Sequence, residues 1–352
     1  MTGTEASSQD RARGALLGLA VGDAAGFPSL YHRTVRLGRR RSQLWKFASD
    51  LDRQQVLRFP LPFSSATPEA LTISASDDGE FAAVAAHILL DCAGDYRPEA
   101  LFAAWQKHVV EPAEDIWSGI AERASITNAQ RGLRPPQTGN DNPQHYDDGA
   151  APRAVPVGIR FAGAPERAAA VARSLAEITH AADGVWAAEA MAATISEAVA
   201  GSSLRDAVEI GHRLIPADSW LSRQVSQALG LADAAASAFD LAADLSDKVA
   251  NRSYSFGTVA PETLASAYAL ALAADGNPQV AIPAAATIAK QADSVPALVG
   301  AITGALAGAE QLPAAWATKV EVLRGICVPA LEGVRLSELA DKLLGAGTAI
   351  RD

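Results

Sequence analysis

Helical periodicity constrains the fold of this chain more than any other feature of the sequence. Phe81, Val84, Ala85, Ile88 and Leu89 are apolar and recur at the spacing of one helix face. Similar runs follow at 166–178, 183–200, 218–245, 260–274, 278–291, 294–310 and 313–327. Alanine, which favours helix, is abundant in these runs. Alternating Val, Ile and Thr segments bounded by turns, which would indicate strands, are scarce. The sequence therefore predicts an all-α helical bundle.

The bundle is expected to form a single domain spanning residues 1–352, because no break after residue 150 is long or polar enough to be a linker. Two segments lack the helical period: 27–75 mixes arginines, aromatics and prolines, and 125–149 is rich in Pro, Gly, Asn and Asp. Long irregular segments in a helical domain are usually functional flaps or disordered excursions. Both lead into acidic pairs, so we expect them to be cleft loops.

Charge and hydropathy exclude several classes of protein. The net charge is −10 and the pI is about 5.1, whereas a general nucleic-acid binder should be basic. No apolar stretch reaches the roughly 20 residues that a bilayer span needs, and the first residues lack the apolar core of a signal peptide. We therefore expect a cytoplasmic protein with no nucleic-acid or membrane partner. Cys92 and Cys327 lie in apolar helical contexts and are expected to be reduced core residues.

Four acidic clusters are candidates for chemistry. They contain Asp23, Asp77 with Asp78, Asp147 with Asp148, and Asp293. Asp23 is expected at the end of the first helix, and a helix cap explains any one cluster taken alone. One cap needs only one carboxylate, however, and adjacent carboxylates repel each other. A hard cation such as Mg²⁺ removes that repulsion and prefers clustered carboxylate and hydroxyl oxygens.

A set of motifs in a fixed order connects these clusters. The opening RARGALLGLAVGDAAG, Ser76-Asp77-Asp78, the segment 149–158, Thr179-His180 and Gln291-Ala292-Asp293-Ser294 occur over about residues 11–316. This order resembles the ADP-ribosylglycohydrolase family of the dinitrogenase-reductase-activating glycohydrolase type. Ser76-Asp77-Asp78 is similar to that family's Thr-Asp-Asp-Thr motif. Gln291-Ala292-Asp293-Ser294 is similar to its Asp-x-Asp-Thr motif, and GAAPRAVPVG to its Gly-Ala-Ala-Met-Arg-x-x-Pro-x-Gly segment.

The resemblance implies an all-α fold in which two Mg²⁺ ions contact a ribose diol and the bond at the anomeric carbon is hydrolysed. By matched position, the implied metal ligands are Ser76, Asp77, Asp78, Asp293 and Ser294. Asp77 or Asp78 is the expected catalytic carboxylate, with no choice between them. The expected substrate-binding residues are Asp23, Asp147, Asp148, Gly149, His180 and Gln291.

Three departures from the family pattern bear on these expectations. Gln291 replaces the first aspartate of the second metal motif, so we expect one firmly bound Mg²⁺ or a weakened second one. Gly79 replaces the second Thr of the first motif. Asp147 and Asp148 replace a Gly-Asn pair, and either line the cleft, bind the ribose or supply the missing charge, or else form a solvated acidic loop. The alternative for His180 is an ordinary helix-end histidine.

The resulting hypothesis is a metal-dependent glycohydrolase that cleaves the bond at C1 of a ribosyl group, foremost in an ADP-ribosyl adduct. Its partner would be a ribosyl-containing small molecule or an ADP-ribosylated protein. One alternative is an N-ribosidase acting on a small nucleoside-like metabolite, and another is a non-catalytic ADP-ribose-binding or structural family member. The presence of Asp77, Asp78 and Asp293 argues against the last, because a structural role requires none of these costly carboxylates.

Overall fold

The computed structural model describes residues 6–31, 74–250, 258–288, 290 and 294–348. In these ranges the chain forms helices and no strands, with two isolated β-bridges, Asp147–Val259 and Val322–Arg335. The all-α prediction is confirmed. None of the helices in the described ranges is long and apolar enough to cross a membrane.

The helices follow one another along the chain from Ser8 to Thr348. They are α1 (Ser8–Tyr31), α3 (Asp77–Asp91), α4 (Pro98–Trp105), α5 (Ile120–Gln130), α6 (Gln137–Asn140), α7 (Ala150–Arg160), α8 (Pro165–Ala176), α9 (Asp183–Ala200), α10 (Leu204–Arg213), α11 (Trp220–Ala234), α12 (Ala238–Lys248), α13 (Ala260–Ala273), α14 (Pro278–Ala286), α15 (Ser294–Ala307), α16 (Ala314–Val320) and α17 (Leu336–Thr348).

Helices α1 and α15 pack with their backbones in direct contact. A Cβ atom placed on Gly18 would lie 2.0 Å from the carbonyl oxygen of Gly300, and one on Gly300 would lie 2.0 Å from that of Gly18. Gly14 and Gly304 meet in the same way one turn further along. Only glycine permits this approach, since any side chain would collide with the facing backbone. The part of α1 that contains Gly22 and Asp23 is thereby held against the start of α15.

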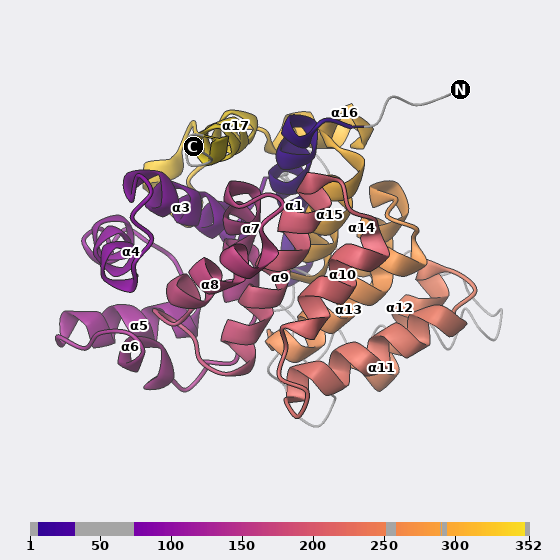
Figure 1. Cartoon of the computed structure of the whole chain (residues 1–352), viewed down its shortest axis with the longest axis horizontal. Helices are drawn as coiled ribbons and strands as arrows, with labels where there is room; N and C mark the ends of the chain where they lie inside the picture. Colours follow the sequence, from indigo (N-terminus) through magenta and orange to yellow (C-terminus); the bar gives the residue numbers. More distant parts are fainter. Residues whose placement is uncertain (1–5, 32–73, 251–257, 289, 291–293, 349–352) are drawn as a thin grey trace.

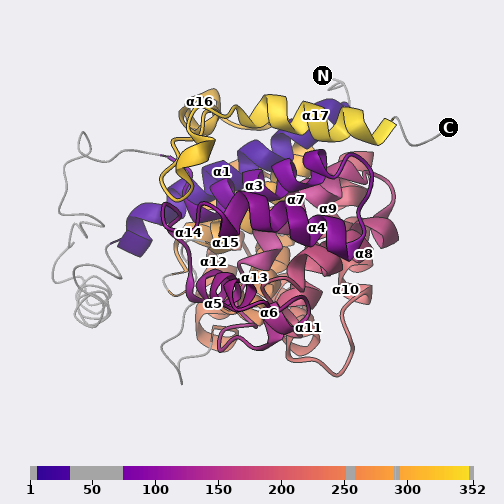
Figure 2. The ribbon, with the colours of Figure 1, turned by 90° about the vertical axis from the view of Figure 1, so that its left-hand side faces the viewer.

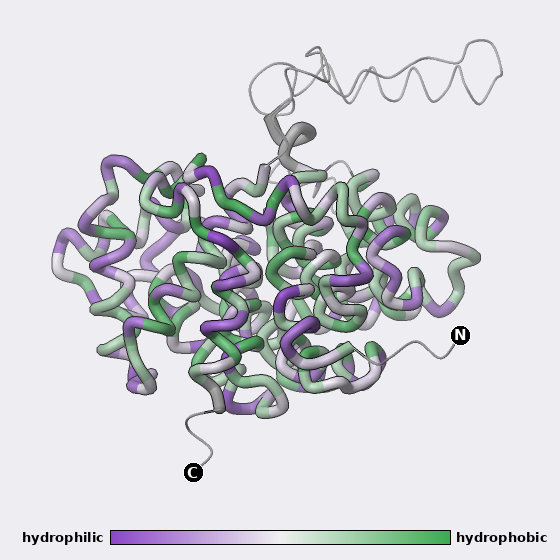
Figure 3. The backbone as a smooth tube through the Cα atoms, turned by 90° about the horizontal axis from the view of Figure 1, so that it is seen from above, coloured by the Kyte–Doolittle hydropathy of each residue, from purple (hydrophilic) through white to green (hydrophobic). Residues whose placement is uncertain are grey.

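The other helices surround this pair. Figure 1 shows α1, α9 and α15 in the middle, α4–α6 at one end of the molecule and α11–α12 at the other. Helix α9 packs against α7, α8 and α10, and α13 against α11 and α15. Figure 2 shows α17 lying across α1. Apolar residues follow the central helices in Figure 3, as expected for one shared core.

A buried carboxylate ties α3 to the chain that precedes α17. Glu80 has no solvent exposure. Its Oε1 accepts the N–H of Ile326 at 2.7 Å, and its Oε2 accepts those of Cys327 and Val328 at 2.7 and 2.8 Å. Three backbone donors compensate for burying the charge. The first turn of α3 is therefore fixed from outside the helix.

The structure corrects several sequence-based boundaries. Helix α1 continues past Asp23 to Tyr31, so this aspartate lies inside the helix and the first residues of the segment 27–75 are helical. Residues 32–73 lie outside the described residues. The beginning of 125–149 completes α5, and α6 lies within it.

Three expected helices are shorter or divided, and one of them, expected at 278–291, ends at Ala286. The helix expected at 218–245 is split into α11 and α12, because the Ser237 hydroxyl accepts the N–H of Asp240 and starts a new helix. The helix expected at 313–327 ends at Val320.

Replacing Gly18 with alanine should destabilise the fold. The added methyl group would meet the Gly300 carbonyl, and overpacking of this kind costs about 1–3 kcal/mol. Gly230 is a matched control in an open position on α11, where alanine should instead add up to about 1 kcal/mol. Urea denaturation measures both changes. Equal stability of G18A and the wild type would contradict the direct backbone contact.

Candidate active site

An open cavity of about 180 Å³ lies where the N-terminal ends of four helices converge. Helix α3 contributes Asp77, Asp78 and Phe81, and α15 contributes Ser294. The start of α5 contributes Gly119, Ala121 and Glu122. The start of α7 contributes Gly149, Pro152 and Arg153. Trp117, Asp147, Asp148, His180 and Thr258 complete the described lining. Helix N-termini carry partial positive charge, which favours carboxylates at such a place.

Asp23 caps α3 from a different helix. Its Oδ2 accepts the N–H groups of Ser76 and Gly79 at 2.7 and 2.8 Å, and the Ser76 hydroxyl donates to Oδ1. Burial, followed by the charge of Asp77, raises the pKa of Asp23. The side chain is fully buried and is not part of the cavity lining. The expected contact between Asp23 and substrate is therefore corrected: Asp23 positions the turn that carries Asp77 and Asp78.

The first motif departs from the family pattern at Gly79 for a packing reason. A Cβ atom at Gly79 would lie 2.7 Å from that of Ala75 and 3.2 Å from Oδ2 of Asp23. The Ser76 hydroxyl is bonded to Asp23 and lies 3.2 Å from Oδ1 of Asp77. Ser76 is buried behind Asp77, whereas Asp77 and Asp78 line the cavity.

Two further aspartates of the cavity lining, Asp147 and Asp148, are buried. Asp147 is 8% exposed and Asp148 is 3% exposed, so the alternative of a solvated acidic loop is wrong. Oδ1 of Asp147 accepts the N–H of Gly149 at 3.0 Å and lies 2.5 Å from Nε2 of His180. Oδ2 of Asp148 accepts the hydroxyl of Thr263 at 2.5 Å. Both aspartates are held by specific partners.

His180 is held in one tautomer by its neighbours. A guanidinium nitrogen of Arg153, Nη2, lies 3.1 Å from Nδ1 of His180, and the Thr179 hydroxyl lies 2.7 Å from it. Because a guanidinium only donates, Nδ1 must accept, and the ring proton is assigned to Nε2, facing Asp147. His180 is buried and orients Asp147. It therefore has a specific partner at the cavity, which an ordinary histidine at a helix end would not need. A Cβ atom at Gly184 would lie 2.9 Å from Cδ2 of His180, so glycine is needed there.

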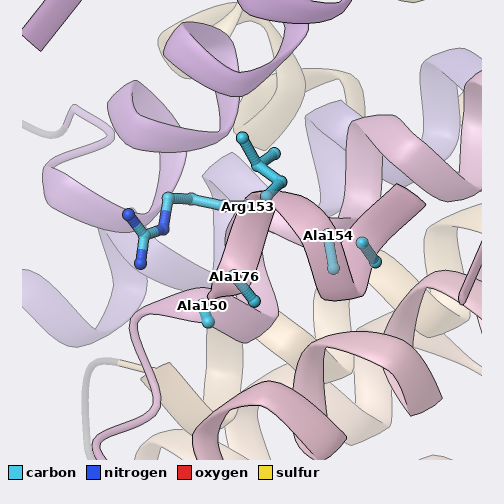
Figure 4. A pocket seen from close by; sticks show the side chains of 6 residues that line it. Ala150, Arg153, Ala154 and Ala176 are labelled. Atoms are coloured by element: carbon cyan, nitrogen blue, oxygen red, sulfur yellow. The ribbon is translucent and has the colours of Figure 1, made fainter. Parts of the chain in front are cut away.

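Arg153 links this wall to α5. It donates from Nη1 to Glu122 at 2.5 Å, from Nε to the carbonyl of Gly149 at 2.8 Å and from Nη2 to the Thr179 hydroxyl at 2.7 Å. Glu122 also accepts the indole N–H of Trp105 at 2.9 Å. Figure 4 shows the guanidinium extending away from the alanines that line a void of about 10 Å³ behind α7. The buried Arg153–Glu122 pair fixes the start of α7.

The second metal motif is described only in part. Ser294 is the first residue of α15 and lines the cavity. Gln291 and Asp293 lie outside the described residues, so their roles stay predictions. Lys290, just before them, pairs at 3.0 Å with the buried Glu262 of α13. Among the residues that the structure describes, no group of three or more His, Cys, Asp or Glu is arranged to hold a metal ion.

Comparison with known proteins identifies the family. The family model for ADP-ribosylglycohydrolase matches residues 4–351. The chain belongs to the ADP-ribosylglycohydrolase family. A solved structure titled "ADP-ribosylglycohydrolase-related protein complex" is 20% identical, with a TM-score of 0.62 over 97% of this chain and 99% of that one. At this identity the likeness shows a shared fold. No curated protein matches the sequence.

Most of the candidate residues that the structure describes lie at or next to one cavity. The structure brings Asp77, Asp78, Asp147, Asp148, Gly149, His180 and Ser294 to one cavity, with Asp23 and Ser76 behind it. Sequence reasoning missed Glu122 and Arg153 as members of the site. Arg153 lies inside the quoted family segment, but nothing in the sequence pairs it with Glu122. Trp117 is 55% exposed at the cavity, and its backbone N–H donates to the Cys327 carbonyl at 2.9 Å.

Replacing Asp23 with asparagine should loosen the first turn of α3. An amide keeps one acceptor oxygen and turns an NH₂ group toward donors, which leaves a buried N–H unpaired at a cost of about 1–3 kcal/mol. We expect a lower free energy of unfolding in urea and faster hydrogen exchange at the Ser76 and Gly79 amides. The exposed Asp218 provides the control, D218N, for which neither quantity should change. Unaltered exchange in D23N would exclude the capping role.

Proposed function

We propose that the chain is a divalent-metal-dependent glycohydrolase that cleaves the bond at C1 of a ribosyl group. The observation that carries the proposal is the meeting of Asp77 and Asp78 with Asp147, Asp148 and His180 around one cavity. These residues come from segments separated by up to about a hundred positions, in a family of ADP-ribosylglycohydrolases. Membership of this family supports action on ribosyl groups. The dependence on a metal ion and the identity of the substrate are proposals.

The donor chemistry of the cavity fits Mg²⁺. Asp77 and Asp78 supply adjacent carboxylates, Ser294 supplies a hydroxyl, and the charge of Asp77 contributes to the raised pKa of Asp23. Hard divalent cations prefer such oxygen donors and neutralise clustered negative charge. Ser76 and Asp293 complete the ligand set by family position, and Gln291 favours one firmly bound ion. When bound, the ion would orient sugar hydroxyls and acidify water.

The carboxylates have two tasks in the proposed reaction. Asp77 or Asp78 accepts a proton from the attacking water, whose oxygen forms the new bond to C1 while the leaving group departs with its electron pair. Positive charge develops at the sugar ring as that bond breaks. A carboxylate 4 Å from this charge is worth about 4 kcal/mol at an effective dielectric constant of 20. The acidic walls therefore favour the transition state over the neutral sugar.

The foremost substrate class is an ADP-ribosyl adduct, on a protein side chain or on a small molecule. One observation favours the second candidate, an N-ribosidase for a nucleoside-like metabolite. The described lining holds five carboxylates against a single guanidinium, Arg153, which Glu122 already pairs. The non-catalytic alternative is disfavoured, because a scaffold gains nothing from burying Asp78 and Asp148 beside a cavity.

Replacing Asp77 or Asp78 with asparagine should distinguish a catalytic protein from a non-catalytic one. Each variant should lose about 10²–10⁴-fold in turnover, the range for removal of a general base, and its thermal shift with Mg²⁺ should shrink. The exposed Asp115 provides the control, D115N, which should behave as the wild type. Turnover is measured on ADP-ribosyl and nucleoside substrates in parallel. Wild-type rates in both D77N and D78N would refute the site.

Mg²⁺ should raise the melting temperature of the wild type, and chelation with EDTA should reverse the rise. Binding to the folded state alone stabilises a protein by mass action. The control is D77N/D78N, in which the rise should be absent because two proposed ligands are gone. A protein whose melting temperature ignores Mg²⁺ and which turns over no ribosyl substrate would be the non-catalytic family member.

A further inference from the structure

A buried ion pair near the cavity has no task in the proposed reaction. Nζ of Lys290 donates to both carboxylate oxygens of Glu262, at 3.2 Å to Oε1 and at 3.0 Å to Oε2. The Glu262 side chain has no solvent exposure, and that of Lys290 is 18% exposed. Desolvating two charges is costly, and replacing a buried ion pair with apolar residues is often neutral for stability. The pair therefore calls for a reason other than stability.

The Glu262 partner belongs to a turn that is bonded to the cavity lining. Glu262 lies in the first turn of α13. The hydroxyl of the next residue, Thr263, donates to Oδ2 of Asp148 at 2.5 Å, and the N–H of Asp148 donates to the Thr258 carbonyl at 3.0 Å. Asp148 lines the cavity. These two hydrogen bonds fix the start of α13 relative to Asp148.

The Lys290 partner leads directly into another part of the lining. Lys290 comes four residues before Ser294, which is the first residue of α15 and lines the cavity. Four residues span at most about 14 Å when fully extended. Anchoring Lys290 to Glu262 therefore limits where Ser294 can lie relative to Asp148, two lining residues that no printed hydrogen bond joins directly.

We propose that Lys290 is a positioning residue for metal binding: its ion pair with Glu262 holds Ser294 in place relative to Asp148. The inference rests on the proposed function and deepens it, because Ser294 is a proposed ligand of the ion. Groups that orient metal ligands from outside the ligand set commonly control affinity, and their loss costs about 10–100-fold in metal binding. The pair acts through the backbone that it anchors.

Removing both charges tests the inference without leaving either one buried alone. E262Q/K290M should bind Mg²⁺ about 10–100-fold more weakly than the wild type, as measured by calorimetry on the full chain. K290R should keep most of the wild-type affinity, because a guanidinium can pair with both carboxylate oxygens. The control K248M removes the exposed lysine of the Lys248–Asp244 pair on α12 and should leave the affinity unchanged.

Hydrogen exchange without Mg²⁺ supplies a readout that does not depend on the metal. In helical geometry the Leu298 amide donates to the Ser294 carbonyl, so it reports on the start of α15. The amides of Leu298 and Asp148 should both exchange about fivefold faster in E262Q/K290M, the factor that corresponds to the net stability of one hydrogen bond. A pair with a purely local role would speed exchange near Glu262 and leave Leu298 as in the wild type.

Weaker Mg²⁺ binding together with faster exchange at both amides supports the inference. Wild-type affinity, or wild-type exchange at Leu298, in a folded E262Q/K290M overturns it, as does an equal loss of affinity in a folded K290R. If the double variant does not fold, E262Q, which weakens the pair without removing it, is held to the same criteria.

Failure of the inference and failure of the proposed function are distinguishable in the wild type. If the wild type binds Mg²⁺ and turns over a ribosyl substrate, the proposed function stands whatever the variants show. If it does neither, the proposed function fails and the positioning role fails with it.

Discussion

The contact between α1 and α15 is the constraint on which the rest of the structure depends. Gly18 and Gly300 bring two backbones together without intervening side chains, and the pairing continues to Gly22 and Pro296. Asp23 follows Gly22 directly, and Ser294 comes two residues before Pro296. The segment around Asp23 and the segment around Ser294, more than 270 positions apart in the sequence, are thus aligned with each other to within one helical turn. A cavity that depends on both requires this degree of precision.

The acidic centre is tolerated because each buried carboxylate meets donors. Asp23 receives two backbone N–H groups and a hydroxyl, Glu80 receives three N–H groups, and Asp147 receives a backbone and an imidazole N–H. Three of these donors, the N–H groups of Ser76, Gly79 and Gly149, lie at the N-terminal ends of α3 and α7, where backbone N–H groups have no partner within the helix. Backbone N–H groups, six of the eight donors, therefore supply most of the compensation, and few basic side chains are needed.

Much of the fold could be predicted from the sequence, because long amphipathic runs carry their own signal. The run at 183–200 coincides with α9. The run at 218–245 concealed two helices, since the break at Ser237 depends on a single capping hydrogen bond that periodicity does not register. The sequence predicts the end of the first helix at Asp23, but α1 continues to Tyr31. Gly18 and Gly22, which precede Asp23, contact α15, which only the tertiary structure reveals.

The site residues that belong to sequence motifs could be predicted. Those that depend on pairing between distant residues could not. Asp77, Asp78 and His180 belong to recognisable segments. The Arg153–Glu122 pair joins residues 31 positions apart through one buried contact, and no local pattern announces it. The burial of Asp147 and Asp148 was equally hidden, because a segment rich in Asp, Asn and Pro has the composition of an exposed loop.

The hydrogen bonds from residues 326–328 to Glu80 also bear on how the cavity is assembled. Asp78 and Glu80 share the first turn of α3, and the backbone donors of Glu80 come from a segment 246–248 positions later in the sequence. Contacts between residues so far apart form only after a long loop has closed. The turn that carries Asp78 is therefore fixed by distant sequence, and local helix propensity alone does not hold it in place.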